Sequence, residues 1–211
     1  MRNHFLVAGA VVAAVCCVPA ICHAQSVPFT HEGFYLQMTL GGGYLRSSAS
    51  FPLSGSNEDV SYYGGAVNGS LWIGGSLVPG FVLGGGTLGA IAISPSAKVT
   101  YQGQSETGTS NSSTSLQLNM IGLISDYYPN PSKGLHFQAL LGYAVMSLND
   151  HNSSNYSASG LGVMGGVGYE FWVSEEWSIG VLGRFAYAAT KYQDTSWPTI
   201  APALLASFTY N

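Results

Sequence analysis

Apolar and polar residues alternate one by one along much of the chain, which is the period of a β-strand. The clearest case is residues 160–189, where two alternating segments flank the short acidic turn at 173–176. In the second segment every other residue is apolar, from Trp177 to Tyr187, and the intervening residues are small or polar and include Arg184. This pattern predicts an antiparallel hairpin with one apolar and one polar face.

Trp177 and Tyr187 are ten residues apart, which places them roughly 25 Å apart along a barrel axis at about 3.3 Å per residue and a tilt near 40°. That is the height of the apolar band of a transmembrane barrel between its aromatic girdles. Phe34 and Tyr44 repeat the spacing on a distant segment. The aromatic residues expected on the lipid-facing girdle are Phe34, Tyr44, Tyr143, Tyr169, Phe171, Trp177, Tyr187, Phe208 and Tyr210.

The same alternation predicts eight strands. They lie at residues 33–46, 60–77, 81–93, 116–127, 134–147, 160–172, 177–189 and 199–210. Glycines blur the third strand, so its faces are left unassigned. In the fourth strand, Leu116, Leu118, Met120 and Ile124 are expected to face lipid.

The connections between the strands alternate in length. Long ones at 47–59, 94–115, 148–159 and 190–198 are separated by short ones at 78–80, 128–133 and 173–176. Transmembrane barrels have short periplasmic turns and longer external loops, so both ends of the mature chain are expected in the periplasm. The long connections should be mobile, above all the polar stretch 97–115.

Composition supports the same architecture. Charged residues make up 8% of the chain, against about a quarter in soluble domains, and no later apolar run is long enough for a transmembrane helix. Only helices and closed barrels satisfy the backbone in hydrocarbon. The predicted fold class is therefore all-β, an eight-stranded antiparallel up-and-down transmembrane β-barrel. A soluble ligand-binding barrel with every face reversed is the rival, and the shortage of charge argues against it.

Residues 1–24 read as a cleaved signal peptide, with Arg2, an apolar run at 5–18 and a small final residue, Ala24. An uncleaved anchor is the alternative. Residues 25–211 form the barrel domain. All three cysteines lie in the leader, which excludes disulfides from the mature chain. Without Arg2 the net charge is about −5, and with no basic patch we expect no nucleic-acid partner.

The polar faces are expected inside, where an eight-stranded barrel is just wide enough to be filled by side chains. The polar residues expected in the interior are Gln37, Gln117, Asn119, His136, Gln138 and Arg184. Leucines at 140, 182 and 205 share this interior, which favours a plugged barrel over an open pore.

Arg184 is expected to be satisfied by interior amides and a carboxylate, with a polar conduit as the alternative. Pairing Trp172 with Trp177 would set Arg184 opposite Gly165 and Glu170 opposite Ile179, which argues against Glu170 as its partner.

The glycine- and aromatic-rich segment 33–44, the hairpin at 165–184 and the aromatic-ended last strand resemble the eight-stranded outer-membrane β-barrel family, the superfamily of the OmpA, OmpX and OmpW transmembrane domains. The chain departs from the family's usual aromatic terminus by ending on Asn211. The resemblance implies a porin-like, OmpA-like protein of a Gram-negative cell envelope. It would be integral to the outer membrane, inserted by the barrel assembly machinery and surrounded by outer-membrane lipid.

The resemblance marks a fold rather than a chemistry, and we expect no catalytic, cofactor or metal site. The leading hypothesis is a non-enzymatic barrel with a structural or adhesion-like role through its long loops. His151 and Ser153 resemble the His-x-Ser pair of lipid A deacylase barrels, so a lipid-modifying enzyme is one alternative. Passage or binding of a small apolar molecule, suggested by the OmpW likeness, is the other.

Overall fold

The computed structural model describes residues 29–53, 56–101, 104–110, 114–150 and 156–211 of the chain, so the expected signal peptide lies outside the described residues. These residues form ten strands. The strands are β1 (Phe34–Leu53), β2 (Ser56–Val78), β3 (Phe81–Ile93), β4 (Ser96–Tyr101), β5 (Gln104–Thr109), β6 (Thr114–Tyr127), β7 (Leu135–Asp150), β8 (Tyr156–Trp172), β9 (Trp177–Tyr192) and β10 (Thr195–Tyr210). Within the described ranges, no helix is long and apolar enough to cross a membrane.

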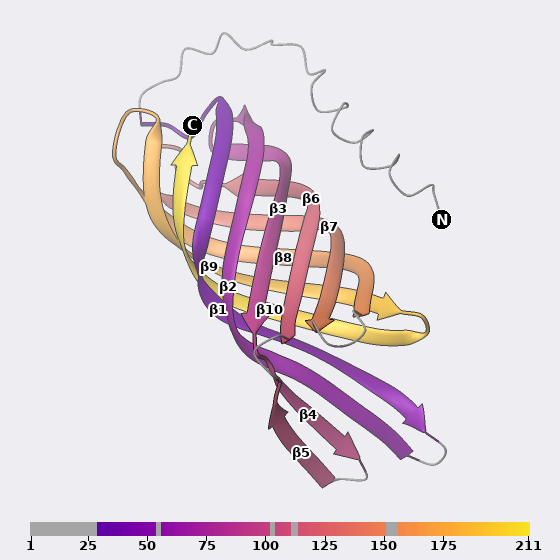
Figure 1. The fold of residues 1–211 in the computed structure, drawn as a ribbon. Helices are drawn as coiled ribbons and strands as arrows, with labels where there is room; N and C mark the ends of the chain where they lie inside the picture. The colour runs from indigo at the N-terminus through magenta and orange to yellow at the C-terminus, as the bar shows by residue number, and fades with distance from the viewer. Residues whose placement is uncertain (1–28, 54–55, 102–103, 111–113, 151–155) are drawn as a thin grey trace, which may run out of the picture.

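Eight of the strands close into a barrel (Figure 1). Antiparallel pairing runs from β1 through β2, β3, β6, β7, β8 and β9 to β10, and β10 pairs back onto β1. The predicted all-β, eight-stranded antiparallel barrel is confirmed. Because the sheet is closed, its strands offer no free backbone edge along the apolar band.

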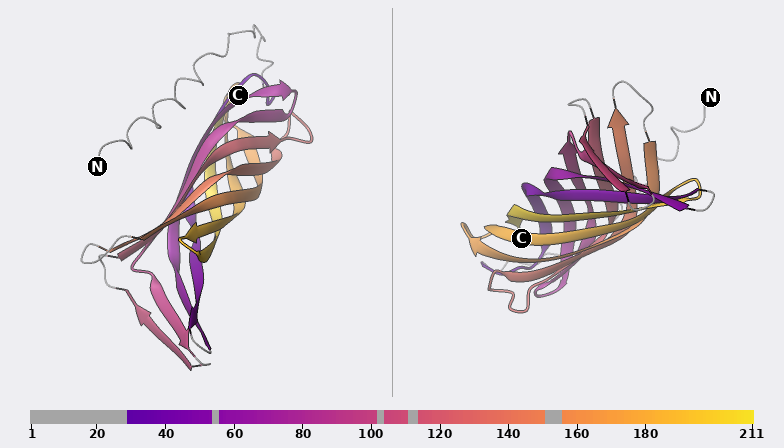
Figure 2. Two further views of the ribbon diagram at one scale, coloured as in Figure 1. Left: turned by 90° about the vertical axis from the view of Figure 1, so that its right-hand side faces the viewer. Right: turned by 90° about the horizontal axis from the view of Figure 1, so that it is seen from below.

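Beyond the barrel, four strands form a projecting sheet. β1 and β2 continue past the last β1–β10 pair, Ser47 with Thr199, and β4 joins β2 from Tyr63 to Glu58. β5 pairs with β4. We call residues 48–53 and 56–63 together with β4 and β5 the projecting sheet; it bends away from the barrel in Figure 2.

The stretch 97–115 contains most of β4 and all of β5, so the prediction that it is a loop is wrong for these residues. All six β5 residues are exposed and most are polar. The β5 strand is therefore held by its backbone ladder to β4 and carries no buried apolar face that alternation could reveal. The other strands match their predicted positions, and most run further than predicted at the end away from the short turns.

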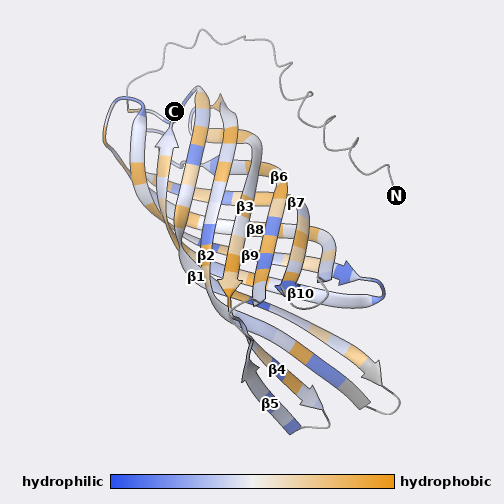
Figure 3. Ribbon diagram, viewed as in Figure 1, coloured by the Kyte–Doolittle hydropathy of each residue, from blue (hydrophilic) through white to orange (hydrophobic). Residues whose placement is uncertain are grey.

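Apolar side chains cover the outside of the barrel, as the recurring orange positions in Figure 3 illustrate. Of the nine girdle aromatics, eight are exposed on the outer face, and Tyr210 is half-buried between Phe34 and Trp177, with ring centroids 6.1 and 5.2 Å from its own. The third strand, left unassigned above, has Val82 and Leu88 inside and Leu83 and Ile91 outside.

The predicted faces of the fourth strand are wrong. In β6, Leu116, Leu118, Met120 and Ile124 are buried inside, whereas Asn119 is exposed and Gln117 lies with it on the outer face. Both faces of β6 carry apolar residues, since Ile121 and Leu123 are exposed on the outside. Alternation alone could not tell them apart. The interior of so narrow a barrel is filled with apolar side chains, and this requirement decides the orientation.

The register of the β8–β9 hairpin also differs from the prediction by one residue. Trp172 pairs with Ser178, which sets Glu170 opposite Gly180 and Arg184 opposite Gly166. The backbone N–H groups of Val173 and Ser174 both donate to the Trp177 carbonyl, so the turn takes up one more residue than a direct Trp172–Trp177 pair would allow.

A short break interrupts the seam between β1 and β10. Gly43 pairs with Ala203 and Arg46 with Ile200, but the intervening Tyr44 and Leu45 have no ladder partner in β10. Pro202 lies opposite this gap, and proline has no N–H to donate to a ladder. The seam is continuous on either side.

The outward position of Val181, midway between the two aromatic levels of β9, gives a direct test of the lipid-facing surface. We expect Val181→Lys to lower the free energy of unfolding by about 2–4 kcal/mol in lipid vesicles, the cost of a lipid-facing cation near the bilayer midplane. Urea titration read by heat-modifiable gel mobility measures it. Ser196→Lys, at the exposed end of β10 away from the short turns, is the matched control and should change little; equal losses would contradict an apolar environment around Val181.

Candidate functional site

A buried polar cluster lies inside the barrel at the end that carries the short turns and the C-terminus. Its two anionic members are Asp126 on β6 and Glu170 on β8, both within 2% of complete burial. Tyr35 donates to Asp126 at 2.7 Å, and His136 Nδ1 lies 3.0 Å from both Asp126 oxygens. Gln138 donates to Asp126 at 2.8 Å.

Glu170 is surrounded by donors in the same way. Thr209 and Gln37 donate to its Oε1 at 2.6 and 3.2 Å, and Ser178 and Tyr128 donate to its Oε2 at 2.7 and 3.3 Å. Gln138 also donates to Gln37 at 2.8 Å and so links the two carboxylates. Buried carboxylates persist only when they are hydrogen-bonded and charge-balanced, and this network supplies the hydrogen bonds.

His136 lies between the two carboxylates, since its Nε2 is 4.0 Å from Glu170. A protonated His136 would balance one of the two negative charges. Glycines on the neighbouring strands make room for the cluster. A side chain at Gly168 on β8 would overlap the His136 ring, and one at Gly180 on β9 would meet Glu170. Gly168 and Gly180 therefore leave the space that the His136 and Glu170 side chains occupy.

Residues before β1 cover the cluster from the short-turn end. The His31 ring stacks on Tyr128 with centroids 3.6 Å apart, and Tyr128 stacks on His136 at 5.0 Å. The His31 backbone bonds to two turns, donating to the Pro131 carbonyl at 2.9 Å and accepting from Gly80 at 3.2 Å. We call residues 29–33 the N-terminal cap; with it in place, the short-turn end of the barrel is covered.

Between the buried cluster and the opposite end of the barrel, side chains fill the interior. Leu140, Leu182 and Leu205 are all buried there. Arg184 is buried at this level, and none of its guanidinium nitrogens has a hydrogen-bond partner among the described residues. The expected interior amides and carboxylate do not reach it. Its ladder neighbours are Gly166 and Ala203, and both carboxylates are hydrogen-bonded within the buried polar cluster.

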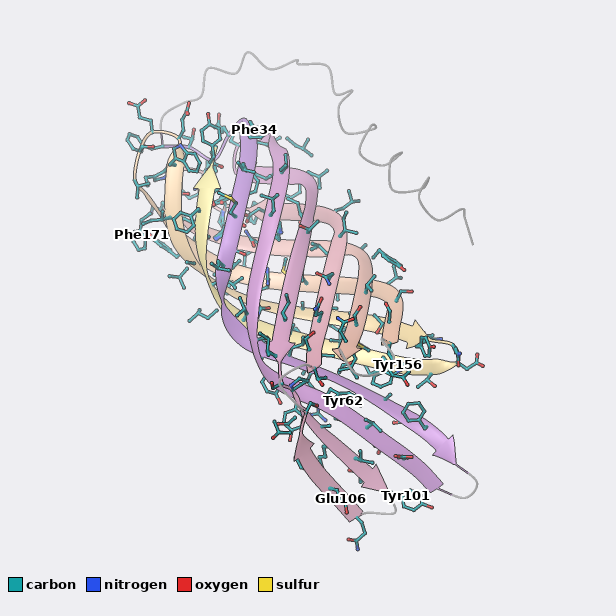
Figure 4. The ribbon with its side chains drawn as sticks, viewed as in Figure 1. Phe34, Tyr62, Tyr101, Glu106, Tyr156 and Phe171 are labelled. Carbon is teal, nitrogen blue, oxygen red and sulfur yellow. The ribbon has the colours of Figure 1, made fainter. Side chains whose placement is uncertain are left out.

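The opposite end holds an apolar cavity of about 320 Å³, here called the mouth pocket. Its aromatic lining comes from the inward faces of five strands, β1, β2, β8, β9 and β10, at their ends away from the short turns. The lining residues are Phe51, Val60, Tyr62, Leu116, Met146, Leu148, Tyr156, Ser157, Ala158, Tyr192 and Trp197. Figure 4 labels Tyr62 and Tyr156 near this end of the barrel.

Trp197 organises the mouth pocket. Its ring lies 6.4 Å from Tyr62 in a stacked arrangement and 6.0 Å from Phe51 edge-on, while Tyr156 and Tyr192 form a second edge-on pair at 6.0 Å. Thr190 donates to the Trp197 carbonyl at 2.6 Å and fixes the backbone beneath the ring. A flat apolar molecule fits such a lining better than an ion or a sugar.

The predicted interior residues are only partly brought together. Gln37, His136 and Gln138 meet in the buried cluster, Arg184 lies apart from them, and Gln117 and Asn119 are on the outside. The sequence analysis did not identify Asp126, which lies near the end of the predicted fourth strand, or the inward position of Trp197. The His151 and Ser153 pair lies outside the described residues. Among the described residues, no three His, Cys, Asp or Glu side chains are placed to hold a metal ion.

Comparisons with known proteins relate this geometry to a fold. No protein-family model and no curated protein sequence matches the chain. Among solved structures, Neisserial surface protein A is 16% identical over 84% of this chain and 96% of its own, with a TM-score of 0.51. OprG of Pseudomonas aeruginosa is 12% identical over 88% and 100%, also at 0.51. The outer-membrane protease OmpT of Escherichia coli, 11% identical over 88% and 99%, reaches 0.43 and carries no argument about chemistry here.

Glu170 gives the first test of the cluster. We expect Glu170→Ala to lower the free energy of unfolding by about 3–5 kcal/mol, because the four buried side chains that donate to Glu170 lose their acceptor. The exposed Glu175 of the same hairpin is the matched control, and Glu175→Ala should stay within about 0.5 kcal/mol of the wild type. Urea unfolding in lipid measures both, and equal effects would contradict a stabilising role for the cluster.

The N-terminal cap should detach in acid. Burial lowers the pKa of His31 from 6.5 to about 4, partly offset by the nearby Glu170. Detached or unfolded chain therefore binds a proton that the capped barrel does not, and stability falls as pH drops from about 6.5 to 4, by on the order of 3 kcal/mol. Proteolysis of the cap measured against pH tests this. His31→Phe keeps the stack and should remove the pH dependence; an unchanged profile would contradict the assignment.

Proposed function

Since the chain has the fold of the eight-stranded outer-membrane barrels, we propose that it is an integral outer-membrane protein that binds a small apolar molecule in the mouth pocket. In this proposal the mouth pocket and the projecting sheet face outward from the cell, and the short turns and both mature termini lie in the periplasm. The unequal length of the connections at the two ends supports this orientation.

The mouth pocket is the observation that carries the proposal. It is concave, falls within the size range of small-molecule sites at about 320 Å³, and is lined by aromatic and aliphatic side chains. The mouth of a β-barrel is a usual place for such a site. Five aromatic residues occupy inward-facing positions at this end and contact one another, and a bound apolar molecule would cover the parts of their rings that are still exposed to water.

Binding is favoured over passage through the barrel. Between the mouth pocket and the buried polar cluster, the interior is occupied by buried leucine and methionine side chains, and the N-terminal cap covers the short-turn end. These side chains therefore block a molecule in the mouth pocket from moving further into the barrel. This arrangement supports a binding protein rather than an open channel.

A surface-interaction role through the long connections is the second candidate. The projecting sheet supports it, because this sheet extends beyond the barrel and ends at the exposed strand β5. An edge strand offers unpaired backbone groups to a partner chain. Both candidates are non-enzymatic, and they place the function at the same end of the molecule.

Tyr62 and Tyr63 are neighbours on β2 that face opposite sides, and they make matched variants. Tyr62 lines the mouth pocket, whereas Tyr63 packs against Tyr44 on the outside with centroids 6.3 Å apart. We expect Tyr62→Ala to weaken binding of the neutral probe 2-(2-naphthyl)ethanol about three- to tenfold, through loss of one aromatic contact. Tyr63→Ala should leave binding unchanged.

Calorimetry on protein in phosphatidylcholine nanodiscs, with empty discs subtracted, measures the affinity. Heat-modifiable gel migration shows that each variant is folded. If the wild type binds no probe, or if the two variants behave alike, the mouth pocket is not a ligand site and the surface-interaction role is the better reading.

A further inference from the structure

The inner wall of the barrel continues onto one face of the projecting sheet. Directly paired residues of antiparallel strands point to the same side, and Val60, which lines the mouth pocket, pairs with Val99 on β4. Val99 in turn pairs with Glu106 on β5. A second hollow lies here, about 400 Å³ in volume and lined by Val99, Tyr101, Gln104 and Glu106. We call it the outer hollow; the Val60–Val99 pair separates it from the mouth pocket.

Charge is sorted between the two faces of the projecting sheet. Glu58 pairs with Tyr101 and Glu106 pairs with Val99, so both carboxylates lie on the same inner face as Tyr101. Asp59 and Lys98 occupy the alternate positions and point to the opposite face. Among the described residues of these strands, the inner face carries no Lys or Arg. The outer hollow therefore combines the Tyr101 ring with the Glu106 carboxylate, Glu58 lies on the same face, and the described residues of that face include no Lys or Arg.

We propose that the molecule bound at the external end is an amphipathic cation, with its apolar body in the mouth pocket and its ammonium group in the outer hollow. This inference rests on the proposed function and names the ligand class for it. An ammonium group is attracted both by an aromatic face and by a nearby carboxylate. The outer hollow offers both, through Tyr101 and Glu106.

The spacing of the two hollows suits a single small molecule. Neighbouring strands are about 4.8 Å apart, so the Cα atoms of Val60 and Glu106, two strands apart, lie roughly 10 Å from each other. A bicyclic ring with a short aminoalkyl arm spans such a distance. Figure 4 shows Tyr101 and Glu106 near the tip of the projecting sheet, beyond Tyr62.

The carboxylates on the inner face of the projecting sheet also indicate which ligands should bind weakly. An anionic head group would face Glu58 and Glu106 without a compensating cation on that face. A neutral molecule would gain only the apolar contacts of the mouth pocket. The order of affinity should therefore be cation, then neutral compound, then anion, for ligands that share one apolar ring system.

Three compounds of matched shape test this order on the wild-type protein. They are 2-(2-naphthyl)ethylamine, a cation at pH 7, neutral 2-(2-naphthyl)ethanol and anionic 2-naphthylacetate. Calorimetry in phosphatidylcholine nanodiscs should give the amine about tenfold higher affinity than the alcohol, and the acetate the lowest. The advantage of the amine should shrink as salt is raised, since the outer hollow is exposed to solvent.

Variants locate the effect. Glu106→Gln should reduce the preference for the amine over the alcohol at least threefold and leave the affinity for the alcohol unchanged. Asp59→Asn removes the same charge from the opposite face of the sheet and is the matched control, expected to keep the preference. Glu58→Gln serves as a second inner-face variant if Glu106→Gln fails to show heat-modifiable migration.

The outcomes separate the two proposals. If the alcohol does not bind, the mouth pocket fails as a site and the inference fails with it. If the alcohol binds but the amine gains nothing, or if Asp59→Asn lowers the preference as much as Glu106→Gln, the proposed function stands and the cationic head group is overturned. A preference lost only with inner-face variants supports both.

Discussion

Closure of the sheet through the pairing of β10 with β1 is the constraint on which the rest of the structure depends. In an apolar solvent each unpaired backbone group costs several kcal/mol, so every barrel strand needs two neighbours within the apolar band. Closing eight strands also fixes the diameter, which leaves room inside for side chains and little else. The filled centre, the buried polar cluster and the outward apolar band all follow from that one geometry.

The parts of the fold that sequence could predict are those where the two faces of a strand differ. In β9, Trp177, Val181 and Tyr187 alternate with Ser178, Arg184 and Ala188, and the structure has the same two faces. In β6 both faces are apolar, and the fit of Leu118 and Met120 into the interior decides the orientation. That fit depends on the opposite wall of the barrel, which no local pattern reports.

The candidate site was predictable to a smaller degree, because it is assembled from residues far apart in the chain. Gln37, Gln138 and His136 were placed inside from their parity, but their meeting with Asp126 and Glu170 depends on the slant of four strands. The His31 ring reaches Tyr128 only because the chain before β1 folds back over the turns. β5, with six exposed residues, left no signal in hydrophobicity at all.

The break opposite Pro202 leaves the pairing of the first and last strands without ladder partners at two consecutive β1 residues, Tyr44 and Leu45. These two strands are also the furthest apart in the chain, so joining them costs more loop-closure entropy than joining the two strands of a hairpin. Force applied across the wall would therefore meet fewer backbone hydrogen bonds at Tyr44 and Leu45 than on either side of them. One proline, through its missing amide hydrogen, lies at the place where the wall of the barrel is held by fewer hydrogen bonds.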